Sequence, residues 1–227
     1  MLKGVVFDLD HTLFDRYASL AYVVPEFFKS FKISKSFTRE KAAALIIYAD
    51  RNFVHLGWQR VLDFLDENGL FEEKPSLEQY SEFLLSSFQK ISVPFYFAKP
   101  MLAELREMGL KIGLITNGRT EIQRAKLKNL ELEESFDEII VSGEIGYHKP
   151  DTKPFELMSE RLGIEPFELM YVGDNPENDV EASRRAGYIP VWVKTTGIWC
   201  FDSYQRPELC VDNVSELPTL IKAKGLV

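Results

Sequence analysis

Short apolar runs rich in β-branched residues mark the first fifteen positions and the chain after about residue 94. They have the length of buried strands, and they are Leu2–Phe7, Lys111–Ile115, Glu138–Val141, Leu169–Val172 and Ile189–Val193. The later runs are separated by segments with apolar positions at helical spacing, which are Met101–Met108, Thr120–Asn129, Lys153–Leu162 and Asn178–Ala186. Strands that alternate with single helices predict right-handed βαβ units around a buried parallel sheet.

The segment between the first strand and the rest of the sheet has a different pattern. It shows almost no strand-like alternation, and helical periodicity appears near 17–31, 38–56, 58–68 and 77–90. Ser76 followed by Gln79 is typical of a capping box, and Thr38 is typical of a helix N-cap. The pattern therefore predicts an all-helical insertion.

Together the two patterns predict an α/β protein with two domains. We expect a Rossmann-like catalytic core, formed by residues 1–15 and 94–227, with helices on both faces of a parallel sheet. Residues 16–93 would form a helical cap domain. Near the C-terminal end, we expect Asp212–Ser215 to form a last strand and a helix to begin at Glu216.

Composition adds mainly exclusions. The chain has 27 basic and 35 acidic residues, which give a formal net charge of −8. This argues against general binding to nucleic acid polymers or anionic membranes, because both need a positive protein surface. The apolar run before Asp8 is too short for a signal peptide, and there is no run of about 18 apolar residues that would predict a membrane span. We expect a cytoplasmic protein, and both a monomer and a homodimer fit the sequence.

Polar residues that could take part in catalysis or binding follow four of the predicted strands. In an open parallel sheet, ligands bind at the carboxyl ends of the strands, so residues far apart in sequence can share one crevice. Asp8 and Asp10 follow the first strand directly. Thr116 and Asn117 stand between a strand and a helix, where a hydroxyl and backbone N–H groups can hold a phosphate.

The other two positions add charge of both signs. Lys149 precedes a proline and could neutralise a phosphate or an aspartate. Asp174 emerges at the tip of an apolar strand, and Asp179 follows five residues later. Several carboxylates near Asp8 would be unfavourable without a cation, and hard oxygen ligands suit Mg²⁺.

Each motif alone has an ordinary structural explanation. A single aspartate commonly caps a turn, a strand–helix turn commonly contains Thr and Asn, a lysine is usually at the surface, and an acidic residue such as Asp179 suits a helix N-terminus. The ordered occurrence of all four motifs at strand ends favours a common site.

The set Asp8-x-Asp10-x-Thr12, Thr116, Lys149 and Gly173-Asp174-x-x-x-Asn178-Asp179 resembles the haloacid dehalogenase superfamily of phosphohydrolases with a helical cap inserted after the first motif. The resemblance covers nearly the whole chain. It implies a phosphoric monoester hydrolase, a Mg²⁺-dependent phosphatase that works through an aspartyl-phosphate intermediate.

The resemblance also implies a role for each motif residue. Asp8 would be the nucleophile and Asp10 the general acid, while Thr116 and the N–H of Asn117 would bind the phosphate. Lys149 would offset charge at the transferring group. The implied metal site consists of Asp8, the backbone carbonyl of Asp10, Asp174 and, through a metal-bound water, Asp179.

Alternatives remain at the level of the reaction and the substrate. A sugar phosphate phosphomutase shares every core motif, whereas a 2-haloacid dehalogenase is disfavoured because it needs no acid at the position of Asp10. A small phosphorylated metabolite and a nucleoside monophosphate both fit as the substrate. Cap residues that could contact the leaving group, or simply form a solvated helix face, are Arg16, Tyr17, Tyr48, Arg51, Asn52, His55 and Trp58.

Overall fold

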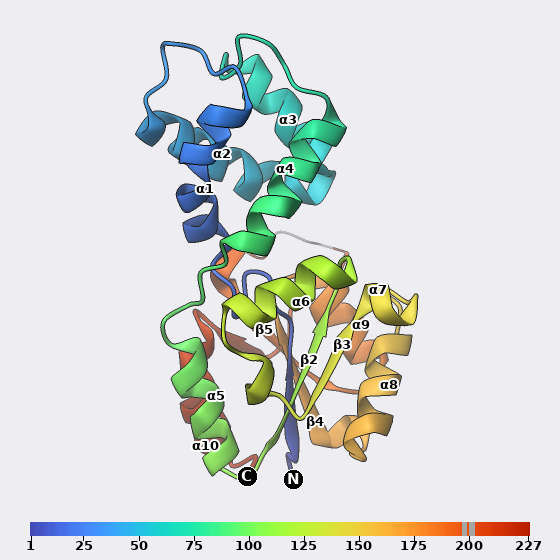
Figure 1. Ribbon diagram of the computed structural model, residues 1–227. Coiled ribbons are helices and arrows are strands. Elements are labelled where there is room, and N and C mark those ends of the chain that lie inside the picture. Colours follow the sequence, from blue (N-terminus) through green and yellow to red (C-terminus); the bar gives the residue numbers. More distant parts are fainter. Residues whose placement is uncertain (197–198, 200–202) are drawn as a thin grey trace. The chain divides into compact units, whose positions relative to one another are not determined.

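The computed structural model describes residues 1–196, 199 and 203–227, without the side chains of His55 and Thr196. The chain forms two compact units (Figure 1). One consists of Met1–Asp15 and Pro94–Val227 and is called the sheet unit here, and the other, Arg16–Val93, is called the helical unit.

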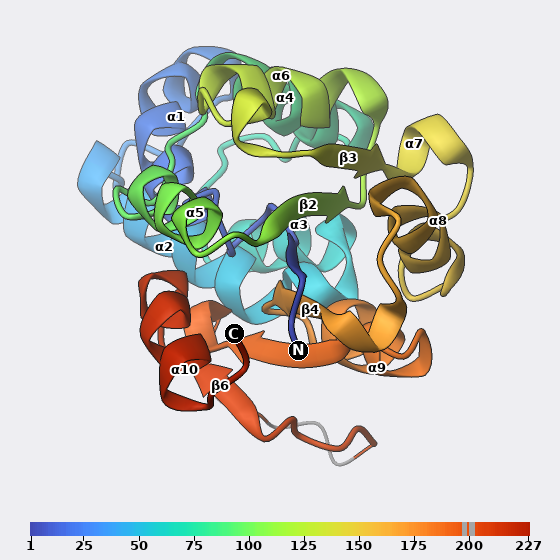
Figure 2. The same cartoon turned by 90° about the horizontal axis from the view of Figure 1, so that it is seen from below.

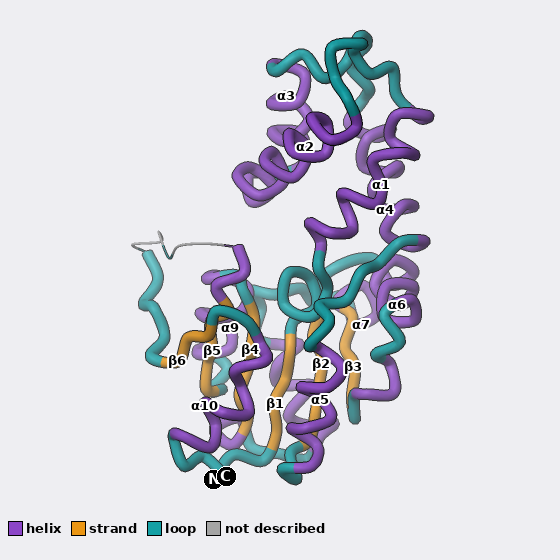
Figure 3. Tube along the Cα trace, turned by 90° about the vertical axis from the view of Figure 1, so that its left-hand side faces the viewer, coloured by secondary structure: helices purple, strands orange, loops and turns teal. Residues whose placement is uncertain are grey.

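The sheet unit is built on parallel strands, as the apolar runs predict. Among the described residues the sheet has six strands in the order β3-β2-β1-β4-β5-β6 (Figure 3). The strands are β1 (Gly4–Phe7), β2 (Lys111–Thr116), β3 (Glu138–Val141), β4 (Leu169–Gly173), β5 (Ile189–Val193) and β6 (Leu209–Val211). Every neighbouring pair is parallel, so all carboxyl ends lie at one edge of the sheet.

Helices cover both faces of this sheet, which confirms the predicted Rossmann-like α/β fold. The helices of the sheet unit are α5 (Ala98–Glu107), α6 (Thr120–Asn129), α7 (Ser142–Ile145), α8 (Lys153–Leu162), α9 (Ala182–Arg185) and α10 (Leu217–Ala223). Figure 2 shows α5 and α10 on one side of the strands and α8 and α9 on the other. On the α8 side, Phe155 and Met158 are fully buried against Val6 and Ile115 of the strands. Burial of these apolar side chains is the main force that fixes the helices to the sheet.

Two expected elements differ from those observed. The segment from Asn178 to Ala186 is not one regular helix, because Pro176–Glu181 forms a π-helix that continues into the short α9. The expected last strand at Asp212–Ser215 was wrong, since β6 lies earlier in the chain. The Asn213 side chain accepts the N–H of Ser215 instead, and this local bond favours a turn over a strand.

The helical unit contains four α-helices among the described residues. They are α1 (Arg16–Ser30), α2 (Arg39–Phe53), α3 (Trp58–Glu67) and α4 (Leu77–Lys90). Thr38 caps α2, and Ser76 with Gln79 forms the predicted capping box of α4. The described part of the chain has no helix that is both long and apolar enough to cross a membrane.

Candidate functional site

The first strand leads into a tight turn that carries two carboxylates. β1 ends at Phe7, and beyond it the Leu9 carbonyl accepts backbone N–H groups from three residues of the turn. His11 has a left-handed φ of 63°, so the extended conformation of the strand does not continue through this segment. Asp8 and Asp10 therefore lie on a turn at the carboxyl edge of the sheet.

A second turn brings two more carboxylates to the same edge. β4 ends at Gly173, Asp174 follows it, and the π-helix after Asn175 carries Asp179. The Asn175 N–H donates to Asp179 Oδ2 at 2.9 Å, which folds the carboxylate back toward the end of the strand. A Cβ atom added at Gly173 would lie 2.4 Å from Asp179 Cγ, so only glycine permits this approach.

Lys149 lies between the two turns and is buried. Its Nζ donates to Asp8 Oδ1 at 2.8 Å, to Asp179 Oδ1 at 2.6 Å and to the Tyr171 hydroxyl at 2.7 Å. The Tyr171 O–H in turn donates to the Ile115 carbonyl at 3.1 Å. An ammonium group has three N–H donors, and all three have an acceptor here. This lysine therefore ties the first motif of the chain to the fourth.

Asn117 fixes the backbone of that lysine. Its Nδ2 donates to the Lys149 carbonyl at 2.8 Å, and its Oδ1 accepts the Lys149 N–H at 2.9 Å. The Lys149–Pro150 peptide bond is cis. The Asn117 side chain thus joins the second motif to the third. The group predicted to bind phosphate is a different one, the backbone N–H of Asn117.

Burial and neighbouring charges shift the pKa values of Asp8 and Lys149. Burial raises the pKa of Asp8 to about 7, and the carboxylates of Asp179 and Asp10 add to the rise, although Lys149 opposes it. Burial would lower the pKa of Lys149, but Asp179 and Asp8 outweigh that effect and raise it well above its ordinary value. Lys149 thus remains cationic, and its single charge does not fully offset the rise in the pKa of Asp8.

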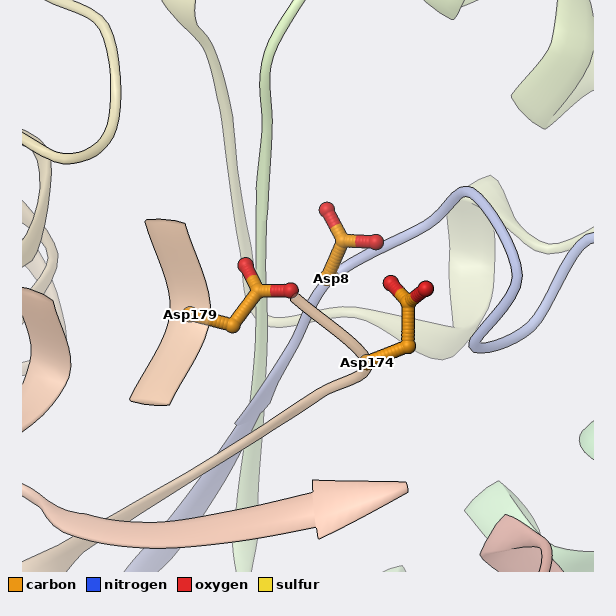
Figure 4. Close-up of side chains that lie close together, drawn as sticks. All are labelled: Asp8, Asp174 and Asp179. Atoms are coloured by element: carbon orange, nitrogen blue, oxygen red, sulfur yellow. The ribbon is translucent and has the colours of Figure 1, made fainter. Parts of the chain in front are cut away.

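Three carboxylates of this cluster could hold a metal ion. Asp8, Asp174 and Asp179 each offer an oxygen within 4.8 Å of the others, and all three residues are buried (Figure 4). Oxygen-only ligands and an excess of negative charge fit a hard divalent cation such as Mg²⁺. The Asp10 carboxylate is not part of this group. The predicted metal ligand was the backbone carbonyl of Asp10, and not its carboxylate.

Asp10 and Thr116 meet through a residue of α6. Gln123 Nε2 donates to Asp10 Oδ2 at 3.0 Å and to Thr116 Oγ1 at 2.5 Å. Lys126 Nζ donates to Asp10 Oδ1 at 2.6 Å. The structure thus places all seven predicted site residues at one edge of the sheet, in two connected clusters.

Three residues of these clusters were not predicted from the sequence: Tyr171, Gln123 and Lys126. A weak signal existed for Tyr171, because a hydroxyl inside an apolar strand needs a hydrogen-bond partner. For Gln123 and Lys126 the signal was their spacing of three on a helix that begins just after the second motif. Neither signal identifies a partner by itself.

The candidate residues of the helical unit have mixed surroundings. On α2, Tyr48, Arg51 and Asn52 are exposed, as a binding face or a solvated face would be. Tyr17 and Trp58 are half-buried. Arg16 is buried and donates to both carboxylate oxygens of Asp50 within its own unit. The His55 side chain lies outside the described residues.

The family model for haloacid dehalogenase-like hydrolases matches residues 5–193, which is most of the chain. The match begins within the first strand and ends at the last residue of β5. It therefore includes every motif residue of the two clusters.

Two curated relatives are named as phosphatases. Over 120 residues the chain is 39% identical to a phosphoserine phosphatase of Thermus thermophilus, and the match covers 53% of this chain and 48% of that protein. The chain thus spans about half the length of that relative. A glyceraldehyde 3-phosphate phosphatase of Methanocaldococcus jannaschii is 26% identical over 243 residues, which cover 98% of each protein.

A solved structure with the same fold is L-2-haloacid dehalogenase from Xanthobacter autotrophicus. Its TM-score is 0.70 at 21% sequence identity, and the match covers 98% of this chain and 99% of that one. At this level of identity the likeness concerns the fold alone.

Proposed function

Because this chain belongs to the haloacid dehalogenase-like hydrolase family, we propose that it is a Mg²⁺-dependent phosphatase that hydrolyses a small phosphate monoester through an aspartyl-phosphate on Asp8. The observation that carries the proposal is the group of carboxylates at the carboxyl edge of the sheet, Asp8, Asp174 and Asp179, two of which contact Lys149. The phosphatase names of the relatives support the same class of reaction.

In the first half of the reaction a carboxylate oxygen of Asp8 attacks phosphorus. The new Oδ–P bond forms as the bond from phosphorus to the leaving oxygen breaks, and Asp10 gives its proton to that oxygen. Thr116 and the N–H of Asn117 hold the phosphoryl oxygens, and Lys149 balances negative charge beside the nucleophile.

In the second half water cleaves the aspartyl-phosphate. Asp10, now ionised, takes a proton from the water as its oxygen attacks phosphorus, and the Oδ–P bond breaks to return free Asp8 and inorganic phosphate. Asp8, Asp174 and Asp179 fit the proposed metal site, where a bound Mg²⁺ would neutralise charge that builds up on the phosphoryl oxygens. Asp10 thus ends the cycle protonated, with a proton from water in place of the one that left with the alcohol.

The substrate is proposed to be a small phosphorylated metabolite or a nucleoside monophosphate. The phosphoserine and glyceraldehyde 3-phosphate in the names of the relatives are both small three-carbon phosphate esters. We propose that the helical unit acts as a cap that selects the leaving group, with the exposed α2 residues Tyr48, Arg51 and Asn52 as its contacts. The protein would then act in the cytoplasm, where such metabolites occur.

The deciding experiment compares wild type with Asp8→Asn on 4-nitrophenyl phosphate in the presence of Mg²⁺. We expect phosphate release to fall by on the order of 10⁴-fold or more, as it does when other hydrolases lose their nucleophile. The control is Asp212→Asn, which removes an exposed carboxylate of the same unit. An Asp8→Asn variant with the activity of wild type would refute the mechanism.

A substrate panel then separates the phosphatase from the phosphomutase. Sugar phosphates, nucleoside monophosphates, phosphoglycolate and phosphoserine would each be incubated with the enzyme and Mg²⁺. Free inorganic phosphate is the product expected here. Return of the phosphoryl group to another hydroxyl of the same sugar would identify a mutase instead.

A further inference from the structure

The Asp10 carboxylate is held on both of its oxygens by side chains of α6. Gln123 Nε2 donates to Oδ2 at 3.0 Å, and Lys126 Nζ donates to Oδ1 at 2.6 Å. The two donors are three residues apart, so they lie on one face of the helix. A carboxylate with a charge-assisted bond on one oxygen and an amide bond on the other has a restricted orientation.

Gln123 connects this carboxylate to the second motif. The same Nε2 that reaches Asp10 also donates to Thr116 Oγ1 at 2.5 Å, and Gln123 is only 2% exposed. A Cβ atom added at Gly118, whose φ is +148°, would lie 2.9 Å from Gln123 Cγ. The turn after β2 is therefore packed directly on the glutamine, which holds Asp10 and Thr116 in a fixed relation.

Lys126 is buried, and burial of a lysine ammonium group is energetically unfavourable. Its side chain is 5% exposed, and its Nζ lies 4.8 Å from the centre of the Phe14 ring. Lysines usually extend their ammonium group to water, and a buried one needs partners for its charge. Lys128, two residues further along α6, is exposed. The buried position of Lys126 is thus a property of its site and not of the helix as a whole.

We propose that Lys126 and Gln123 are positioning residues for the acid–base group Asp10, which they orient toward the oxygen that gains or loses a proton. The inference rests on the proposed function, since it needs Asp10 to act as acid and base. Neither residue exchanges a proton in the reaction. One proton goes from Asp10 to the leaving oxygen, and a second passes to Asp10 from the attacking water.

The first test measures kcat/KM of Lys126→Met on a series of aryl phosphates, from 4-nitrophenyl to phenyl to 4-methoxyphenyl phosphate. Poorer leaving groups depend more on the acid, which contributes roughly 10²- to 10⁴-fold in general. We expect a loss of roughly 10- to 100-fold on the poorest leaving group, a smaller loss on 4-nitrophenyl phosphate, and partial recovery in Lys126→Arg. Lys128→Met is the matched control and should behave as wild type. Equal losses across the series would contradict a positioning role.

The second test combines Lys126→Met with Asp10→Asn. If the lysine acts through Asp10, it should cause little further loss once that carboxylate is gone, whereas a residue that only supports the fold would lower activity by the same factor in both backgrounds. Multiplicative effects would overturn the inference. Lys126→Gln replaces Lys126→Met if that variant does not fold. Gln123→Met should depend on Asp10 only in part, because Gln123 also donates to Thr116.

The two proposals fail in different ways. An active Asp8→Asn variant would refute the aspartyl-phosphate mechanism itself. An inactive Asp8→Asn variant, together with independent effects of Lys126 and Asp10, would leave that mechanism standing and refute only the role of Lys126.

Discussion

Two buried cations of this chain, Arg16 in the helical unit and Lys149 in the sheet unit, are neutralised in different ways. Arg16 donates from Nε and Nη2 to the two oxygens of Asp50 at 2.9 and 2.8 Å, and its guanidinium lies 4.8 Å from the centre of the Phe88 ring. The two bonds have the paired geometry that guanidinium and carboxylate groups favour.

Lys149 faces an excess of negative charge. It contacts Asp8 and Asp179 directly, and Asp174 offers a third carboxylate to the same group. Burial and pairing are common to both sites, so neither property distinguishes a functional cluster from a structural one. The described contacts do differ in number: Arg16 bonds one carboxylate, whereas Lys149 contacts two, and a third carboxylate belongs to the same group. A further cation would therefore be more favourable at the sheet cluster.

The largest effect on stability should come from breaking the Arg16–Asp50 pair. Asp50→Ala removes both hydrogen bonds of this pair from a buried guanidinium, and breaking a buried ion pair typically costs about 3–5 kcal/mol. We expect the free energy of unfolding, measured by urea denaturation, to fall by that amount. Arg16→Met combined with Asp50→Leu removes both charges and should restore most of the stability.

The control for this prediction is an exposed ion pair. Lys222 Nζ lies 2.9 Å from Glu104 Oε1, and both side chains are about half exposed. Glu104→Gln should change the free energy of unfolding by less than about 1 kcal/mol, because surface pairs contribute little. If Asp50→Ala were equally mild, the buried pair would not be the structural element that the comparison describes.

Most of the fold could be predicted because strands and helices have different periodicities. The apolar runs gave β1 to β5 within a residue or two, and the capping box at Ser76 gave the start of α4. β6 was placed too late, because three residues, Leu209–Val211, are too short a run to give a period. The π-helix at Pro176–Glu181 also has no periodicity that distinguishes it from an α-helix start.

The candidate site was predictable from topology alone where residues follow strands directly. Asp8, Thr116 and Asp174 stand at strand ends, so the parallel topology alone brings them to one edge of the sheet. Gln123 and Lys126 lie on the flank of a helix, and their partner Asp10 is more than a hundred residues away. A contact of this kind depends on how the helix packs, which no local pattern in the sequence reports.

The burial of Asp8 should make the Mg²⁺-free protein less stable as the pH rises. The pKa of Asp8 is about 7 in the folded protein against an ordinary value of 3.8, mainly because of burial. Below both values Asp8 is protonated in each state. Between them the unfolded chain loses the proton while the folded protein keeps it, so stability falls from about pH 4 to about pH 7. The loss could reach a few kcal/mol, since one pKa unit corresponds to about 1.4 kcal/mol.

Asp8→Asn isolates this effect from other titrating groups. The variant should lack the Asp8 part of the pH dependence, and near pH 8 it should be more stable than wild type when Mg²⁺ is absent. The loss of a carboxylate would then stabilise the sheet unit, whereas the same loss at Asp50 destabilises the helical unit. Parallel pH profiles for wild type and Asp8→Asn, measured by urea denaturation, would show that Lys149 already balances the cluster.

A smaller effect should follow from supplying the cation. If Mg²⁺ binds the folded cluster and not the unfolded chain, a concentration of 100 times Kd adds about 2.7 kcal/mol to the free energy of unfolding. We expect the thermal midpoint of wild type to rise with MgCl₂ and that of Asp174→Asn to change little, because the variant lacks a carboxylate of the group. Asp212→Asn, which removes an exposed carboxylate, should respond as wild type does. If Asp174→Asn were stabilised as strongly as wild type, Mg²⁺ would act elsewhere, and the excess charge around Lys149 would need another explanation.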